Sequence, residues 1–274
     1  MQLGIFAKTF STQGAVNTFS AVRKAGYNAT QFNMSCVGLP SLPQEIDFGV
    51  LEGIAEASRS SGVAISAVSA TYNMIHPDDK QRRNGKRALS TVIGAARAMG
   101  TGLVTLCTGT RDAEDQWRYH PDNRNAATWR DLLVEMEEAA DIAEAHSINL
   151  GIEPELANVV YDAATARRLI DEIKSPCIRI VLDPANLFEV EEAAQRLDII
   201  SRSVDLLGDH IAMAHAKDRD ATGKFVVAGK GVMDFSHFIG KLKSIGFNGP
   251  VITHGLSEDE APEVARFLTR IIAR

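Results

Sequence analysis

The sequence has few of the features that mark secreted, membrane-spanning or metal-thiolate proteins. It contains three cysteines, Cys36, Cys107 and Cys177, and none of them forms a CxxC pair. Neither a disulfide framework nor a thiolate zinc site is therefore indicated, and we expect buried free thiols. No run approaches the roughly 18 apolar residues of a membrane span. The start of the chain also lacks a charged leader followed by an apolar region, so we expect a cytoplasmic protein with no membrane partner.

An excess of basic charge is also missing. The formal net charge is −6 and the pI is about 5.7. Because phosphate-backbone binding normally needs a net basic face, no nucleic-acid partner is expected. A small molecule is the better expectation for the ligand. The one basic cluster, residues 80–87, is typical of a solvated helix face.

Short apolar runs recur at regular intervals and predict eight strands. They lie near residues 3–6, 28–32, 63–69, 103–107, 149–153, 178–183, 210–215 and 250–254. Amphipathic stretches lie between them, and glycine stops follow several, at Gly26, Gly62, Gly100 and Gly246. Strict alternation of strands and helices favours a parallel sheet, and no GxGxxG turn follows the first strand. We expect a (β/α)₈ TIM barrel that forms a single domain over residues 1–274, because such barrels have about 250 residues.

The last four strands each end in a residue that can bind a metal: Glu153, Asp183, His215 and His254. The C-terminal strand ends of a parallel barrel converge on one mouth, so these side chains should be neighbours. Carboxylate and imidazole together suit Mn, Mg, Zn, Co or Fe, and the mixture does not choose among them. A structural ion pair for the carboxylates, a backbone-bonded His215 and a strand-capping His254 are the alternatives.

Loops after other strands supply further candidates for the pocket. Asn73 and His76 follow the third strand and are expected to contact substrate. Arg111 follows the fourth and could clamp a carboxylate or phosphate, or else pair with Asp112 or Glu114. The aromatic stretch 116–122 suggests a lid, and packing against a second subunit of a homo-oligomer explains it nearly as well.

Two segments after the seventh strand differ in the role expected of them, one in the site and one in a turn. Lys217 should point to the same side as His215, where it could stabilise an enolate oxygen or simply pair with an aspartate. The turn Gly229-Lys230-Gly231 resembles a phosphate cradle only superficially, because no strand precedes it and no helix follows directly. Asp234 is expected to cap a helix that begins near residue 235.

Several short motifs together resemble those of the xylose isomerase-like TIM barrel superfamily, the sugar phosphate isomerase/epimerase group. They are Leu-Gly-Ile-Glu-Pro at 150–154, Val-Leu-Asp-Pro-Ala-Asn-Leu at 181–187, Ala-His-Ala-Lys-Asp at 214–218, Gly-Lys-Gly-Val-Met-Asp-Phe at 229–235 and Ile-Gly-Phe-Asn-Gly-Pro at 245–250. The resemblance implies a metal held by Glu, Asp, His and a second Glu, with enediolate chemistry on a small sugar. The first three map onto Glu153, Asp183 and His215.

The chain departs from this pattern at the eighth strand, where His254 replaces the second glutamate. A two-glutamate mechanism is therefore excluded, but a Glu153/His254 pair can still move a proton. Asn186 stands where many epimerases have histidine and could bond a substrate hydroxyl. Glu155 is a candidate substrate contact.

These observations predict a metal-dependent isomerase or epimerase of a small sugar or sugar acid, possibly phosphorylated, with Glu153, His254 and Lys217 as catalytic groups. The same enolate could expel a β-hydroxyl, so a dehydratase acting on an inosose-like ketone is an alternative. Two further alternatives are an AP endonuclease-like phosphodiesterase, which would need more histidines at strand ends, and a non-catalytic sugar-binding barrel.

Overall fold

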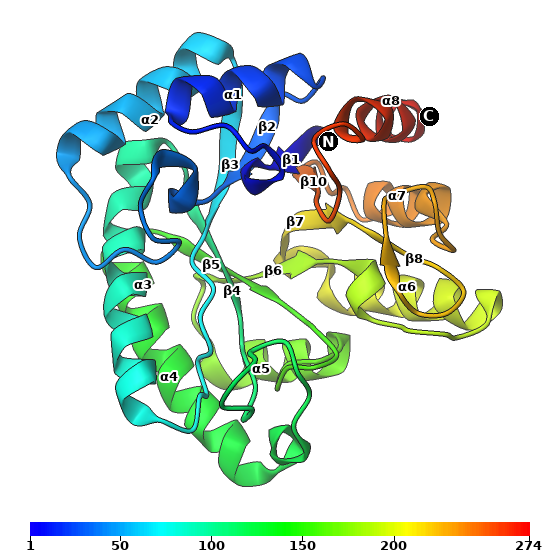
Figure 1. Cartoon of the computed structure of the whole chain (residues 1–274). Coiled ribbons are helices and arrows are strands. Elements are labelled where there is room, and N and C mark those ends of the chain that lie inside the picture. Colours follow the sequence, from blue (N-terminus) through cyan, green and yellow to red (C-terminus); the bar gives the residue numbers. More distant parts are fainter.

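Eight parallel strands close into a barrel in the computed structural model of the chain, which describes residues 1–274 (Figure 1). Around the barrel the order is β1, β10, β7, β6, β5, β4, β3 and β2, so β1 pairs with both β10 and β2 and completes the ring. The barrel strands are β1 Gln2–Phe6, β2 Ala29–Phe32, β3 Ala64–Ser69, β4 Leu103–Cys107, β5 Asn149–Glu153, β6 Ile178–Leu182, β7 Ile211–Ala216 and β10 Pro250–Thr253. All eight lie where the apolar runs predict strands, and the predicted TIM barrel is confirmed.

Helices alternate with the strands and cover the outside of the barrel (Figure 1). They are α1 Ala15–Lys24, α2 Phe48–Ser61, α3 Asp79–Met99, α4 Ala126–Ala145, α5 Ala163–Ile173, α6 Ala193–Leu207, α7 Phe235–Ser244 and α8 Ala261–Ile272. Short 3₁₀ helices are η1 Ala7–Thr9, η2 Met34–Val37, η3 Pro121–Arg124, η4 Pro184–Asn186 and η5 Gly208–His210. The connection from β7 to α7 contains a small antiparallel hairpin of β8 Asp218–Arg219 and β9 Phe225–Val226.

The helix ends follow the local sequence signals. Gly62 ends α2 and Gly100 ends α3 in the left-handed conformation that glycine adopts without steric cost. Asp234 caps α7 as predicted, because its Oδ1 accepts a hydrogen bond of 2.9 Å from the backbone N–H of His237. Gly62 and Gly100 thus set where the chain leaves a helix and turns into the next strand, and Asp234 sets where α7 begins.

A small apolar layer inside the barrel supports the mouth. It consists of Ala67, Leu103, Val181, Met213 and Ile252, one residue from each of five strands. Side chains two positions apart on a strand point to the same side. The residues two positions beyond the last three members therefore also point into the barrel, directly above this floor, whereas a much larger apolar cluster packs between the strands and the helices.

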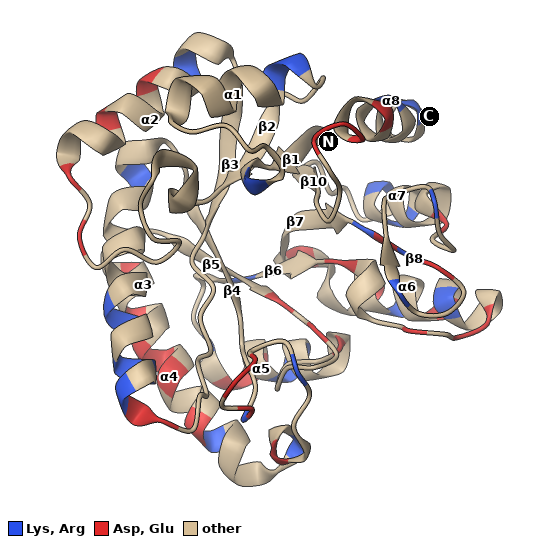
Figure 2. Ribbon diagram, viewed as in Figure 1, with Lys and Arg blue, Asp and Glu red and all other residues tan.

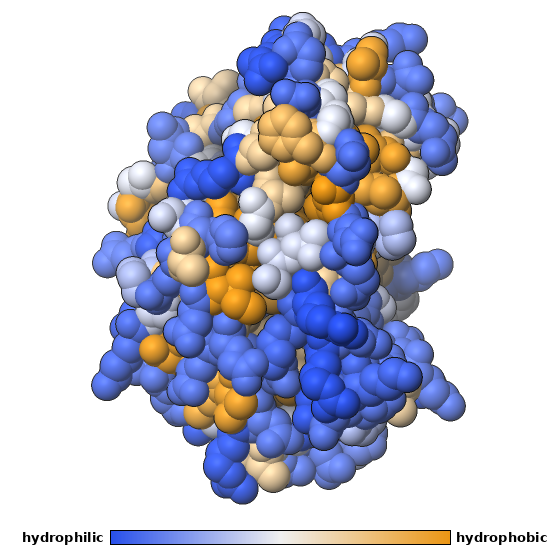
Figure 3. Space-filling view, turned by 90° about the vertical axis from the view of Figure 1, so that its left-hand side faces the viewer, coloured by the Kyte–Doolittle hydropathy of each residue, from blue (hydrophilic) through white to orange (hydrophobic).

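Charged residues lie mainly on the helices and loops outside the barrel, and α3 and α4 carry residues of both signs (Figure 2). The basic stretch 80–87 lies on α3, as expected of a helix face. On the face that Figure 3 shows, apolar side chains gather in separate areas among hydrophilic ones. All three cysteines are free and buried, as predicted. No helix combines the length and the apolar character needed to cross a membrane.

Closure of the barrel at β1 depends on the absence of a side chain at Gly4. A Cβ there would lie 2.8 Å from the carbonyl oxygen of Ala29 on β2 and would also collide with Cδ1 of Ile252 on β10. We expect Gly4→Ala to destabilise the protein by about 1–3 kcal/mol, as overpacking does, and to lower its thermal midpoint. The control is Gly53→Ala on α2, where an added Cβ meets nothing within 4 Å. A Gly4→Ala midpoint as high as that of the control would contradict this account of closure.

Candidate metal centre

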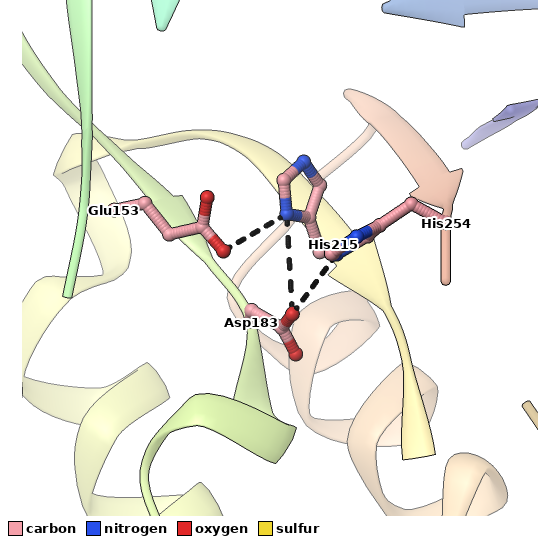
Figure 4. A group of neighbouring side chains, drawn as sticks. All are labelled: Glu153, Asp183, His215 and His254. Atoms are coloured by element: carbon pink, nitrogen blue, oxygen red, sulfur yellow. Dashed lines mark hydrogen bonds and ion pairs between the residues drawn. The ribbon is translucent and has the colours of Figure 1, made fainter. Parts of the chain in front are cut away.

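The four residues at the ends of the last barrel strands meet at one place, as their positions predict (Figure 4). Glu153 is the last residue of β5, Asp183 follows β6, His215 lies in β7 and His254 follows β10. Their potential ligand atoms all lie within 4.8 Å of one another. The convergence is a consequence of the barrel geometry, and the role of these residues as ligands stays a prediction.

Direct contacts connect the four side chains. Nδ1 of His215 lies 3.1 Å from Oε1 of Glu153 and 4.0 Å from Oδ2 of Asp183. Nε2 of His254 lies 3.2 Å from the same Oδ2, and the two imidazole rings are 4.5 Å apart between centroids. Asp183 is completely buried and His215 nearly so. A buried carboxylate without compensating partners is costly, so the neighbours of Asp183 must supply hydrogen bonds or positive charge.

The donor set fits a single divalent metal ion. Bonds from such an ion to imidazole nitrogen or carboxylate oxygen are about 2.0–2.2 Å long, so donors on opposite sides lie roughly 4 Å apart. The 4.8 Å span of the four donors is close to this value. Two carboxylates and two imidazoles suit Mn, Fe, Co or Zn, and the structure does not choose among them. This is the one group of three or more His, Cys, Asp or Glu residues in the chain that could hold an ion.

The charge states of these groups suit metal binding. Burial raises the pKa of the Asp183 carboxyl, but the charge of Lys217 and the hydrogen bond from His254 outweigh burial and hold it well below its usual range. Burial likewise opposes ionisation of Glu153, and the charge and hydrogen bond of His215 lower its pKa overall. Burial and the neighbouring His215 lower the pKa of His254. At neutral pH the two carboxylates are anionic and His254 is neutral, which are the forms that ligate metals.

A hydrogen-bond chain from two distant strands orients His215. Its Nε2 lies 2.8 Å from Oε1 of Gln31 on β2. The amide of Gln31 in turn donates a hydrogen bond of 2.9 Å to Oγ1 of Thr105 on β4. With its NH₂ group used in this way, Gln31 presents an acceptor to His215, which favours a proton on Nε2. Nδ1, which contacts Glu153 here, is then the nitrogen that would lose its proton and bind a metal. Neither Gln31 nor Thr105 carried a signal in the sequence.

Asn186 joins the two sides of the site. Its Nδ2 donates to Oε1 of Glu153 at 2.8 Å, and its Oδ1 accepts from Nζ of Lys217 at 2.6 Å. Nζ of Lys217 also lies 3.3 Å from Oδ2 of Asp183. The ion pair considered for Lys217 is therefore present, and it places the ammonium beside the ligand cluster.

A cavity of about 480 Å³ opens above the cluster, within the range of about 300–1,000 Å³ usual for small-molecule sites. Among its lining residues are Lys8, Glu155, Trp117 and Phe225. Burial raises the pKa of Glu155 to about 7, and no hydrogen bond opposes the shift. Phe225 comes from the β8–β9 hairpin, where it covers Lys217 at 3.8 Å from ring centroid to Nζ. The alternation of strands and helices gave no sign of this hairpin.

Not every predicted pocket residue reaches this cavity. Arg111 turns away from it, because its guanidinium is held by Asp131, by the hydroxyl of Thr128 and by the carbonyl of Ile75. Arg111 does not pair with Asp112 or Glu114, the two partners predicted for it, because both carboxylates pair with Arg118. The guanidinium of Arg111 is therefore occupied by groups of the protein, and a contact of Arg111 with substrate stays a prediction.

Two other predicted contacts line a neighbouring cavity. Asn73 and His76 lie in this second cavity, which shares Gln116 and Trp117 with the first. Their polar atoms bond to the β4–α4 loop: Nδ2 of Asn73 donates to the carbonyl of Thr110, and Nε2 of His76 lies 3.0 Å from that of Ala113. Gln116 and Trp117, from the aromatic stretch predicted as a lid, form the wall between the two cavities.

Comparison with known proteins identifies relatives of the fold. A family model described as "Xylose isomerase-like TIM barrel" matches residues 19–271. No curated protein sequence matches the chain. Among solved structures, 3-keto-D-glucoside 4-epimerase YcjR from E. coli superposes with a TM-score of 0.79 at 14% identity, covering 98% of this chain and 99% of that one. At this identity the likeness concerns the fold alone.

Two further similar structures match this chain over nearly their whole length. An L-ribulose 3-epimerase gives a TM-score of 0.77 at 17% identity and covers 99% of this chain and 94% of its own. The IOLI protein, described with a bound zinc atom, gives a TM-score of 0.75 at 16% identity. The match covers 100% of this chain and 98% of the IOLI chain. A bound metal is therefore known for one protein of this fold.

Removal of Asp183 should empty the site. We expect protein purified without chelator to carry one divalent ion per chain and Asp183→Ala to carry none, because a fully buried ligand is lost; elemental analysis measures both. His254→Ala should hold the ion more weakly if His254 is the fourth ligand, because three ligands remain. Asp259→Ala, at an exposed position, is the control and should keep the ion. Wild-type protein that stays empty when manganese, zinc or magnesium is added would contradict the assignment.

The orientation of His215 by Gln31 gives a second prediction. Gln31→Leu should weaken metal binding by about 10- to 100-fold, the usual cost of losing such a supporting contact, and Gln31→Glu should restore most of it because a carboxylate also accepts from Nε2–H. Titration calorimetry with manganese measures the affinities. Gln116→Leu makes the same chemical change elsewhere in the cavity and should bind normally. Equal affinities for Gln31→Leu and Gln116→Leu would disprove the role of Gln31.

Proposed function

The chain belongs to the xylose isomerase-like TIM barrel family, and we propose that it is a metal-dependent isomerase or epimerase of a small sugar or sugar acid. The observation that carries the proposal is the meeting of two carboxylates and two imidazoles beside a buried lysine, at the floor of a small-molecule cavity. The similar structures named above include two sugar epimerases, which supports the same reaction class.

The reaction is proton transfer at a carbon next to a carbonyl. A divalent cation held by Glu153, Asp183, His215 and His254 would supply Lewis acidity toward the carbonyl and its neighbouring hydroxyl. The protein's own task is to bind the substrate over these residues and to move one proton.

Two atoms are available for the proton. Both contacts that Glu153 makes use Oε1, so Oε2 is free to take a proton from the substrate carbon. His254 contacts Asp183 through Nε2, and in a state in which it does not bind the metal its imidazole can hold or return a proton. Imidazole is suited to this task near neutral pH. Glu153 and His254 thus divide the acid and base roles.

Lys217 stabilises the charge that develops on the substrate oxygen. Its Nζ is held beside Asp183 and Asn186, and it lines the cavity. A fixed ammonium in a site from which water is excluded stabilises an enolate oxygen strongly. Asn186 and Glu155, both in the cavity wall, are proposed to bond substrate hydroxyl groups.

More distant parts of the mouth have lesser roles in this proposal. Asn73 and His76 line the second cavity, so they would contact a substrate only if it were long enough to extend into that cavity. Gln116 and Trp117 exclude water from the intermediate as a lid. Because one four-residue ligand set is present, and not the larger set of a trinuclear centre, we do not propose phosphodiester cleavage.

The test is exchange of a substrate proton with solvent. When the metal-loaded enzyme is incubated in D₂O with D-fructose, D-tagatose or L-ribulose, the sugar should take up one deuterium at the carbon beside its carbonyl. NMR measures this uptake. Glu153→Gln should slow the exchange by about 10²–10⁴-fold, the usual contribution of an acid–base group, while the exposed Glu137→Gln leaves it unchanged. Loss of water from the substrate would indicate a dehydratase instead. Binding of sugar without exchange would indicate a non-catalytic barrel.

A further inference from the structure

The loop between β7 and α7 contains an anion-binding turn that faces inward. In TIM barrels a phosphate site is frequently formed by the loops after the seventh and eighth strands. The turn Gly229-Lys230-Gly231 lies in the first of these loops and packs against α8, because a Cβ on Gly229 would meet the ring of Phe267. Successive backbone N–H groups in a glycine turn make a concave site for an anion.

The carboxylate of Asp218 fills this turn. Its Oδ2 accepts hydrogen bonds from the backbone N–H groups of Gly229 and Gly231, both at 3.0 Å. Its Oδ1 accepts from the N–H groups of Met233 at 2.9 Å and Arg219 at 2.8 Å. Asp218 is 0% exposed. Four N–H donors that could hold a ligand phosphate are therefore used by a side chain of the chain itself.

The turn has no room for a second anion. A Cβ on Gly231 would collide with the backbone carbonyl of Arg219 and lie too close to the carboxylate of Asp218. The neighbouring guanidinium is also committed, because Nε of Arg219 donates to the carbonyl of Ala185 at 2.6 Å and its Nη1 donates to that of Gly223. Neither the backbone nor this arginine can turn toward a phosphate without breaking buried hydrogen bonds.

The cavity itself supplies little positive charge. Its cationic side chains are Lys8 and Lys217, and Lys217 is engaged by Asp183 and Asn186. Lys8 is exposed, so water screens its ammonium and weakens its attraction for an anion. Glu155 adds a carboxyl to the wall. An anionic substrate would find no pre-arranged set of donors here.

Aromatic surface is available instead. Trp117 and Phe225 line the cavity and remain 51% and 43% exposed. Large apolar side chains left open to water at a cavity mouth are suited to cover the C–H face of an uncharged sugar ring.

We propose that the substrate is an uncharged, unphosphorylated sugar, and that Asp218 closes the turn at 229–231 against phosphate. The inference rests on the proposed function and narrows it, since a phosphorylated sugar or a sugar acid is then excluded. Asp218 is a positioning residue: it holds the loop that carries the hairpin and Phe225, and it does not touch the substrate.

One arm of the test needs no turnover. Inorganic phosphate is titrated into metal-loaded protein labelled with ¹⁵N, and the amide signals of Gly229 and Gly231 are followed. We expect no saturable shift in the wild type. Asp218→Ser, which frees the four N–H groups, should gain such shifts, and Asp220→Ser in the same hairpin should not. Saturable shifts of these two amides in the wild type would overturn the proposal, even if Asp218→Ser fails to fold.

The second arm compares matched substrates. D-Fructose is compared with D-fructose 6-phosphate, and D-ribulose with D-ribulose 5-phosphate, by the kcat/KM of deuterium exchange. The free ketose of each pair should react at least about tenfold faster, because juxtaposed like charges without compensating donors are costly. A phosphate ester that reacts as fast or faster, and slower in Lys8→Ala, would overturn the proposal. If no ketose exchanges, the proposed function fails, and the amide titration still decides whether the turn is closed.

Discussion

The complete burial of the Asp183 carboxylate at the barrel mouth is the constraint on which the site depends. A buried charge must be balanced by nearby cations or donors. Lys217, His254 and His215 approach it from the seventh and eighth barrel strands, and Asn186 joins Lys217 to Glu153. A divalent ion would add positive charge beside the same carboxylate. The folded chain and a bound metal therefore both depend on neutralising Asp183.

Much of this arrangement could be predicted from sequence, because it depends on local pattern. Short apolar runs located all eight barrel strands, and the shared direction of parallel strands brought four strand-end residues together. Contacts that depend on barrel closure or loop path could not be predicted. Gln31 reaches His215 across the barrel interior only because closure of the ring brings β2 within three strands of β7. Arg111 pairs with Asp131 because α4 returns along the same loop, and sequence distance does not encode that.

The chain keeps its anion-binding and cation-binding groups apart. Around the ligand cluster, carboxylates and imidazoles point into the cavity, as a metal requires. Beyond it, the backbone donors of the glycine turn point inward to Asp218. The resemblance of Gly229-Lys230-Gly231 to a phosphate cradle is therefore genuine in its local geometry, yet the ligand is internal. A substrate in the cavity would meet the carboxylate and imidazole cluster, an amide and aromatic surface, which favours recognition of hydroxyl groups over charged ones.

The central claim is that one divalent ion binds two imidazoles and two carboxylates at the mouth of this barrel. X-ray absorption spectroscopy of the cobalt- or zinc-loaded protein tests it most directly, because scattering from imidazole rings counts the histidine ligands. The account predicts two imidazole nitrogens and two or more oxygens at about 2.0–2.2 Å, with one imidazole fewer in His254→Ala. A spectrum with no histidine scattering, or one unchanged in that variant, would contradict it.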